Sequence, residues 1–479
     1  MPHPDLDQPL RGWTAVETAT AIRRREVAVT EVVTAAIERM QAWEPILHAM
    51  VTTTPERALA DAARIDDALT AGVVDVGSMA GVPTVVKDLS DLAGVETRQG
   101  SRAITGMVPT ANGVEVDELL SSGMVNLGKS ATPEFGLIAT TEPLFGDPTS
   151  NPWAPTHSAG GSSGGAGALV AAGVVPIAHA TDGGGSIRIP AAVNGLVGLK
   201  PTVGRHVQMR RMRGLPIKIS VSNVVTRTVA DTAAHMAALE RHHRATHLPP
   251  VGIVEGPARR RLRIGVAIDG PNAPTAPSIA AATRDTADRL AGLGHHVSAI
   301  DLPFGKGFGD DFVLYWASLA QVTVRLLPRS MPDTFDRDLV DPFTATLADH
   351  ARANMRRIPG AIRRLRAAGQ TYREVFTHVD VILTPTLAQP TPRLGATSPR
   401  LGFDELTPWL MDYAQFTPLH NTVGSPAISV PAGHDAGLPI GVQLAALPGD
   451  DRTLLELAYA LEEAAPWPLL APIPTRSVV

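Results

Sequence analysis

The fold of this chain is constrained most by a series of short apolar runs that begins near residue 80 and is repeatedly broken by glycine. Runs of this kind, bounded by turn-forming residues, are typical of strands buried in a sheet. The runs are Val82–Val86, Val125–Leu127, Val174–Ala178, Leu262–Ile268, Val297–Leu302, Val381–Leu383, Ala427–Val430 and Gly441–Leu444. A helical pattern over residues 278–293 separates two of them, as in a β-α-β unit. The pattern predicts an α/β fold.

Helical signals dominate the first seventy residues. Apolar residues recur at helical spacing from Val32 to Met40. Residues 54–56, Thr-Pro-Glu, are typical of a helix start, and this helix is expected to continue to Leu69. Near the other end of the chain, Thr453 and Glu456 form a predicted capping box before a final helix.

The domain organisation follows from the absence of a long linker rich in glycine, serine and proline. We expect one domain over residues 1–479, with a helical N-terminal layer (1–75) and an α/β core (76–470). Residues 1–13 lack the basic and apolar segments of a signal peptide. The longest weakly polar stretch, residues 167–180, is shorter than the roughly 18 residues that span a bilayer. A cytoplasmic protein without a membrane partner is the expectation.

Composition excludes several functional classes. Lys and Arg number 42 against 47 Asp and Glu, a net charge of −5, which argues against a nucleic-acid partner. The chain has no cysteine, so disulfides, thiolate nucleophiles and cysteine-ligated metals are excluded. The 15 histidines show no standard ligand spacing, and we expect neither a metal nor another cofactor.

Two motifs suggest functions that their context does not favour. Residues 123–130, GMVNLGKS, match a phosphate-binding loop, but the expected order of strand, loop and helix is reversed around them. A nucleotide-binding protein is therefore kept only as an alternative. Residues 160–164, GGSSG, match the nucleophile elbow of α/β-hydrolases, whose serine directly follows a strand. The preceding residues 151–159 contain two prolines and are expected to be irregular.

Two glycine–serine clusters and one lysine carry the chemistry. Lys87 closes an apolar run, so burial is expected to lower its pKa and leave a neutral amine that can accept a proton. Gly183, Gly184 and Gly185 precede Ser186, and the backbone N–H groups of residues 183–186 can form an oxyanion hole. Ser162, in the first cluster, could bridge Lys87 to Ser186. The alternative is that both clusters are tight turns and that Lys87 is a surface charge.

The order of these elements resembles the amidase signature family from about residue 10 to residue 465. The resemblance rests on residues 160–165 (GGSSGG) and 182–190 (DGGGSIRIP), with Ser162 and Ser186 separated by 186 − 162 = 24 residues. Several flanking segments also match: Gly128-Lys129, Pro133–Phe135, Asn151–Trp153, Gly198–Pro201, Thr384–Thr386 and Gly437–Gln443.

The resemblance implies a mixed, largely parallel central sheet covered by helices on both faces. It also implies Ser186 as the nucleophile, Ser162 on a cis peptide bond as the bridging serine, and Lys87 as the base. Ser163, Asp182 and Arg188 are expected to support the site, and the helix after Ser186 to add its dipole.

The implied substrate is a small-molecule amide, linear or cyclic, and the pattern is most similar to bacterial amidases of the 6-aminohexanoate-cyclic-dimer hydrolase type. A glutamine-hydrolysing transamidosome-type subunit is the enzymatic alternative, and a homodimer is left open. Ala159 stands where many members have proline. Gly183 stands where bulkier residues are common, which either widens the pocket or loosens the loop. Pocket residues are expected from 209–212, 312–316 and 409–416.

Overall fold

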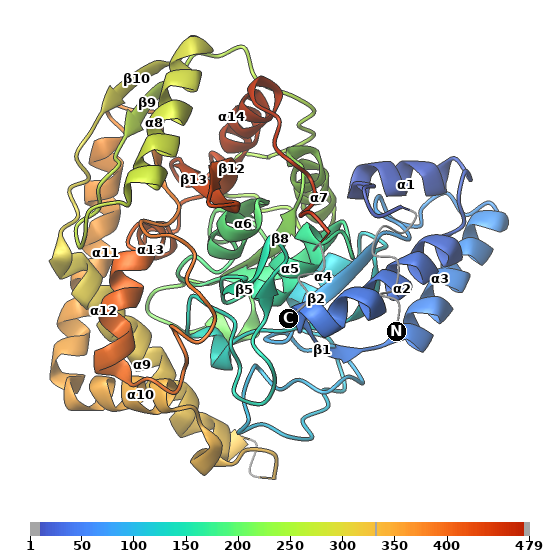
Figure 1. Cartoon of the computed structure of the whole chain (residues 1–479), viewed down its shortest axis with the longest axis horizontal. Helices are drawn as coiled ribbons and strands as arrows, with labels where there is room; N and C mark the ends of the chain where they lie inside the picture. Colours follow the sequence, from blue (N-terminus) through green and yellow to red (C-terminus); the bar gives the residue numbers. More distant parts are fainter. Residues whose placement is uncertain (1–9, 331–332, 474–479) are drawn as a thin grey trace.

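An eight-stranded sheet runs through the described residues, 10–330 and 333–473, of the computed structural model (Figure 1). Its strand order is β10-β9-β11-β13-β12-β7-β8-β6. The strands are β6 (Ile177–Asp182), β7 (Val197–Lys200), β8 (Val221–Thr226), β9 (Arg263–Val266), β10 (His296–Ala299), β11 (Val381–Pro385), β12 (Ala427–Asp435) and β13 (Leu438–Ala445). Every apolar run predicted between Val174 and Leu444 contributes residues to one of these strands, which confirms the α/β class.

The sheet is mixed, as predicted. Neighbouring strands pair in parallel among β10, β9 and β11, and the pairs from β11 to β6 are antiparallel. Five of the eight strands (β8 to β12) nevertheless run in one direction. The β12–β13 hairpin produces much of the antiparallel pairing, since Ala436 and Gly437 both take positive φ in its tight turn.

One face of the sheet is covered by α7 (Val229–His242), α8 (Pro277–Gly292) and α14 (Asp451–Ala464) (Figure 1). Alternate residues of each strand point to the same side. Val197 and Leu199 of β7 and Ile428 and Val430 of β12 therefore share one apolar cluster with these helices. The β-α-β unit predicted around residues 278–293 is confirmed, because β9 and β10 pair in parallel around α8.

The opposite face carries α5 (Gly164–Ala171) and α6 (Arg188–Asn194). Small residues of the strands face α6. A Cβ atom at Gly198 would lie 2.6 Å from the Cβ of Ala191, and one at Gly441 would lie 2.6 Å from the Cβ of Ala192. These two glycines let α6 pack directly on the sheet, and the loop of residues 183–187 is held against the sheet with it.

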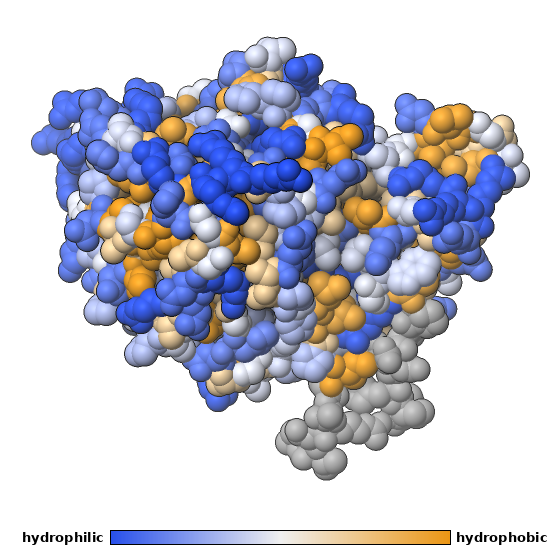
Figure 2. Space-filling model, turned by 90° about the horizontal axis from the view of Figure 1, so that it is seen from above, coloured by the Kyte–Doolittle hydropathy of each residue, from blue (hydrophilic) through white to orange (hydrophobic). Residues whose placement is uncertain are grey.

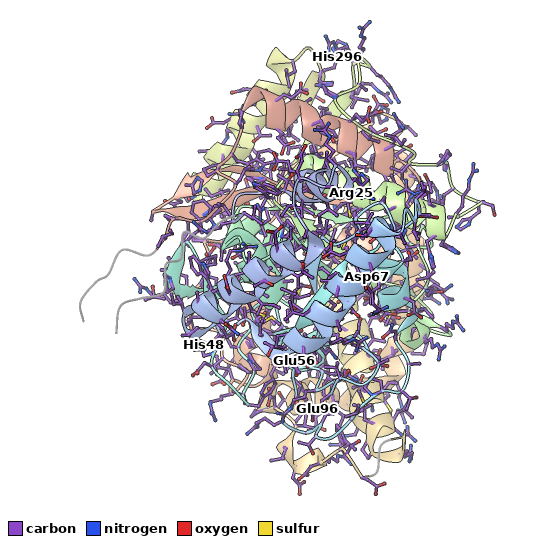
Figure 3. All side chains as sticks on the ribbon, turned by 90° about the vertical axis from the view of Figure 1, so that its right-hand side faces the viewer. Arg25, His48, Glu56, Asp67, Glu96 and His296 are labelled. Atoms are coloured by element: carbon purple, nitrogen blue, oxygen red, sulfur yellow. The ribbon has the colours of Figure 1, made fainter. Side chains whose placement is uncertain are left out.

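The N-terminal layer contains α1 (Ala15–Arg23), α2 (Val29–Leu47) and α3 (Pro55–Thr70), as predicted. Figure 3 views this layer from its solvent side, where Glu56 and Asp67 are exposed on α3. The layer is not purely helical, because β1 (Met50–Thr53) pairs with β3 (Val125–Ser130), which in turn pairs in parallel with β2 (Pro83–Lys87). This small sheet positions Lys87.

A group of helices at the lower left of Figure 1 flanks the loops at one end of the main sheet. It comprises α9 (Lys306–Ser330), α10 (Pro342–Ala353), α11 (Ile358–Val375), α12 (Phe403–Tyr413) and α13 (Thr417–Thr422). The remaining α-helix of the described residues is α4 (Val114–Leu120), and the remaining strands are the short pair β4 (Ser150–Asn151) and β5 (Ala154–Ser158).

Two local predictions were wrong. Residues 151–159 are not irregular, since β4 and β5 pair there. The final helix begins at Asp451, and Thr453 lies inside it rather than capping it. Tertiary contacts set this start, because the buried Asp451 carboxylate accepts hydrogen bonds from the backbone N–H of Thr202 (2.8 Å) and from its hydroxyl (2.6 Å).

Figure 2 shows hydrophilic and hydrophobic residues mixed over one face of the molecule. Across the described ranges, no helix combines the length and the apolar character that a membrane crossing requires. The prediction about a signal peptide concerns the N-terminus, of which residues 1–9 lie outside the described part of the chain.

Candidate active site

Lys87 is a buried side chain that contacts three hydroxyl groups. Its backbone ends β2, and its side chain is 0% exposed. The Nζ atom donates to Oγ of Ser162 at 2.7 Å, to Oγ of Ser163 at 2.9 Å and to Oγ1 of Thr181 at 3.1 Å. The alternative of a surface lysine is therefore excluded.

The first glycine–serine cluster brings Ser162 to Lys87. The peptide bond between Gly161 and Ser162 is cis, the geometry that the resemblance implies. A Cβ atom at Gly161 would lie 2.6 Å from backbone atoms of Thr140, so only glycine fits there. Ser163 occupies the N-cap position of α5, and its hydroxyl bonds both Lys87 and the backbone of Thr181.

The second cluster is organised by a buried ion pair. Asp182 ends β6, and its carboxylate accepts bonds from Arg188 at 2.9 Å and 3.0 Å. The same carboxylate accepts the backbone N–H groups of Gly185 (2.7 Å) and Ile187 (3.2 Å). Asp182 and Arg188 therefore shape the loop that carries Ser186, and their role in supporting a catalytic site stays a prediction.

These contacts narrow the predicted set of oxyanion donors. The N–H of Gly185 is occupied by Asp182, so this group is not free to bind an oxyanion. In the described part of the chain, the N–H groups of Gly183, Gly184 and Ser186 donate to no protein atom. Gly185 still has a backbone role, since its φ is +129° and a Cβ would lie 2.5 Å from Oγ1 of Thr417.

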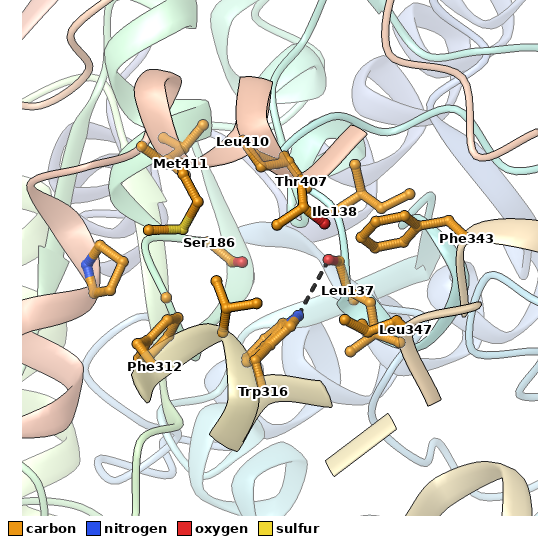
Figure 4. Close-up of a pocket in the computed structure, with 17 residues that line it drawn as sticks. Leu137, Ile138, Ser186, Phe312, Trp316, Phe343, Leu347, Thr407, Leu410 and Met411 are labelled. Carbon is orange, nitrogen blue, oxygen red and sulfur yellow. Dashed lines mark hydrogen bonds between the residues drawn. The ribbon is translucent and has the colours of Figure 1, made fainter. Parts of the chain in front are cut away.

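Ser186 lies where two cavities meet. The first cavity has an empty volume of about 660 Å³ and the second about 840 Å³, both including solvent at their mouths. They share Gly136, Leu137, Ser186 and Trp316. Figure 4 shows the first cavity, with Leu410 and Met411 on one side of Ser186 and Phe312 and Trp316 on the other.

Each segment predicted to line a pocket reaches one of these cavities. Residues 312–316 and 409–416 contribute to the first, and Met212 contributes to the second. Residues 137–139, Phe343 and Leu347 also line the first cavity and have no distinguishing mark in the sequence.

The space beside Gly183 is already filled. A Cβ atom at Gly183 would lie 3.3 Å from the indole ring of Trp316, and one at Gly184 would lie 3.3 Å from the ring of Phe312. The absence of a side chain at Gly183 therefore makes room for an aromatic ring rather than widening an open pocket.

The phosphate-loop match at residues 123–130 has a structural explanation. Gly128, Lys129 and Ser130 lie in strand β3, not in a loop. The Lys129 ammonium is fully buried and pairs with Asp88 at 2.9 Å. This arrangement does not favour the nucleotide-binding alternative.

Comparisons with known proteins identify the family to which the chain belongs. The family model Amidase matches residues 31–455. A relative from Mycobacterium tuberculosis that is named as an amidase, AmiC, is 44% identical over 471 residues, 97% of each chain.

Solved structures give the same result. A bacterial aryl acylamidase of the amidase signature family aligns with a TM-score of 0.85 and 28% identity, over 96% of this chain and 97% of that one. A 6-aminohexanoate cyclic dimer hydrolase complexed with substrate aligns with a TM-score of 0.82 and 29% identity, over 97% and 98%. The chain therefore belongs to the amidase family, with the fold of the amidase signature enzymes, and is an amide-hydrolysing enzyme.

Proposed function

We propose that the enzyme cleaves a small-molecule amide through an acyl-enzyme on Ser186, with Ser162 and Lys87 as a proton relay. The observation that carries this proposal is the 2.7 Å contact between the buried Lys87 Nζ and Ser162 Oγ. Ser162 and Ser186 line the same cavity, which supports a proton path from Ser186 through Ser162 to the lysine.

Acylation of Ser186 moves one proton along the relay. Ser186 Oγ forms a bond to the amide carbonyl carbon and loses its proton to Ser162, whose own proton passes to the neutral Lys87 amine. The negative charge that develops on the carbonyl oxygen is stabilised by backbone N–H groups, for which Gly183, Gly184 and Ser186 are candidates. The proton then returns through Ser162 to the leaving nitrogen as the C–N bond breaks, and water later hydrolyses the ester.

The supporting residues keep this geometry in place. The hydroxyls of Ser163 and Thr181 also accept hydrogen bonds from Lys87 and so help to hold its amine beside Ser162. The carboxylate of Asp182 fixes the loop before α6, whose N-terminus adds a favourable dipole near Ser186. A single domain, a cytoplasmic location and the absence of a nucleic-acid partner stay predictions, and a homodimer is still left open.

Kinetics of serine variants test the proposal. Hydrolysis of an anilide is followed by aniline release for Ser186→Ala, Ser162→Ala and the distant control Ser121→Ala. We expect Ser186→Ala to abolish turnover, and Ser162→Ala to lower kcat/KM by about 10²–10⁴-fold, the usual contribution of a proton-transfer group. The control should keep wild-type activity. Wild-type turnover by folded Ser186→Ala would overturn the proposal.

A further inference from the structure

The two cavities at Ser186 differ in whether they reach Ser162, the serine proposed to relay the proton. Ser162 and Thr181 line the second cavity and are not among the residues that line the first. Ser186 lines both. A substrate whose carbonyl carbon lies at Ser186 can therefore extend in two directions, of which only one faces Ser162.

We propose that the first cavity binds the acyl part of the substrate and the second binds the amine part, so that the preferred substrates are secondary amides with an apolar group on each side of the C–N bond. This inference rests on the proposed function, since it takes Ser186 as the nucleophile and Ser162 as the proton donor.

The proton path decides the assignment. As the C–N bond breaks, the leaving nitrogen must receive a proton from Ser162 Oγ, so this nitrogen has to lie within hydrogen-bonding reach of Ser162. Ser162 is reached from the second cavity, so the amine substituent extends there. The acyl group stays bonded to Ser186 and is left in the first cavity, beside Ile189 and Phe312.

The walls of both cavities determine the chemical class of the groups that they bind. Among the described residues, the first cavity is lined by apolar side chains, glycines and the hydroxyls of Ser186 and Thr407. The second adds Gln99 and further hydroxyl groups to apolar residues such as Leu215 and Ile219. No charged side chain of the described residues lines either cavity. An acyl group that bears an ammonium and a carboxylate, as in glutamine, would be desolvated without an ionic partner.

Trp316 lines both cavities. Its indole N–H donates to the backbone oxygen of Leu137 at 3.3 Å, as Figure 4 shows, and its ring stacks on Phe312 with centroids 6.0 Å apart. Gly183 lies beside the six-membered ring of the indole, at Cζ3 and Cη2. The indole is therefore held at several points and forms a wall of both cavities at Ser186.

A matched pair of substitutions tests the assignment. Leu410 lines only the first cavity and Leu215 only the second, and both side chains are half-buried. Leu410→Trp and Leu215→Trp each reduce the space in one cavity. Values of kcat/KM are compared for octanamide (long acyl, ammonia leaving), acetanilide (short acyl, aromatic amine) and octananilide (both). Labelling of Ser186 by a small alkyl fluorophosphonate is measured on every variant.

We expect wild-type enzyme to prefer octananilide to either other amide by at least about tenfold, the scale on which one or two apolar contacts discriminate substrates. Leu410→Trp should lower activity on octanamide about tenfold or more and leave acetanilide within about twofold. Leu215→Trp should do the reverse. If a tryptophan variant is not folded by circular dichroism, the phenylalanine variant at the same position is compared in the same way.

The other outcomes separate two failures. A crossed pattern, with Leu215→Trp impairing octanamide and Leu410→Trp impairing acetanilide, would overturn the assignment while the proposed function stands. Equal wild-type activity on octanamide and octananilide would overturn the secondary-amide class. An enzyme that cleaves none of the three amides and is not labelled at Ser186 would overturn the proposed function itself.

Discussion

The carboxylate of Asp182 and the guanidinium of Arg188 form a fully buried pair, with Nε–Oδ2 and Nη2–Oδ1 separations of 2.9 Å and 3.0 Å. Burial opposes ionisation of Asp182, but the charge and hydrogen bonds of Arg188 outweigh it and hold the pKa of that carboxyl well below its usual range. We expect Asp182→Asn to destabilise the protein by about 3 kcal/mol or more, because a buried guanidinium is left without a counter-charge. Urea unfolding measures the change.

The partly exposed pair of Asp380 and Arg263, 3.0 Å apart, provides the control for this prediction. Asp380→Asn removes the same chemical group from a solvated pair, so its effect on unfolding should be much smaller. Equal effects at Asp182 and Asp380 would show that the buried pair is not a structural requirement of the loop.

Replacing Lys87 by methionine removes the amine and keeps a side chain of similar length. Because the amine bonds Ser162, Ser163 and Thr181, we expect kcat/KM to fall by about 10²–10⁴-fold with the fold intact. Lys218→Met, at an exposed lysine, is the matched control and should keep full activity. Amide hydrolysis and circular dichroism are the measurements. Undiminished turnover by Lys87→Met would remove the lysine from the relay.

Two glycines of the Ser186 loop should respond differently to alanine. At Gly183 the new methyl group would press against the Trp316 ring. A smaller side chain in place of Trp316 can relieve this close contact. Gly183→Ala should therefore lower kcat/KM, and Gly183→Ala with Trp316→Leu should recover part of it. At Gly185 the φ of +129° is strained for any side chain, so no neighbouring substitution should rescue Gly185→Ala. Rescue at Gly185, or none at Gly183, would contradict these roles.

A buried histidine should make stability depend on pH. Burial, with His206 adding to it, lowers the pKa of His235 to about 3. The unfolded chain then binds more protons at this group than the folded protein between about pH 6.5 and pH 3, so its contribution to stability falls as pH falls through that range. We expect the stability gap between wild type and His235→Leu to shift by on the order of 1.4 kcal/mol per pH unit below 6.5. Urea unfolding at pH 7.5, 6.5 and 5.5 checks this, and a constant gap would contradict it.

Strands could be predicted where apolar residues are contiguous, as in β11 and β12, because burial on both faces selects such runs. Strands β7 and β8 could not. Gly198 of β7 is selected by the close approach of α6, and Asn223 of β8 is buried because its amide donates to the backbone oxygen of Leu199 at 2.9 Å. Both residues look unfavourable for a strand until their distant partners are known.

The site shows the same division. Lys87 and the two serines were predicted from local patterns and from the resemblance, and the structure places Ser162 against Lys87 and in one cavity with Ser186. The occupation of the Gly185 N–H by Asp182 could not be predicted from spacing, because it depends on the path of the loop. The cavity walls at Phe343 and Leu347 come from α10, which packs on α9 far from the glycine clusters in sequence.

The identity of the nucleophile is the central claim, and covalent labelling tests it most directly. Wild-type enzyme, Ser186→Ala and Ser162→Ala are treated with a fluorophosphonate and digested, and the modified serine is located by mass spectrometry. We predict a label on Ser186 in the wild type, slower labelling of Ser186 in Ser162→Ala, and no label in Ser186→Ala. A label on Ser162 or Ser163 that persists in Ser186→Ala would contradict the mechanism.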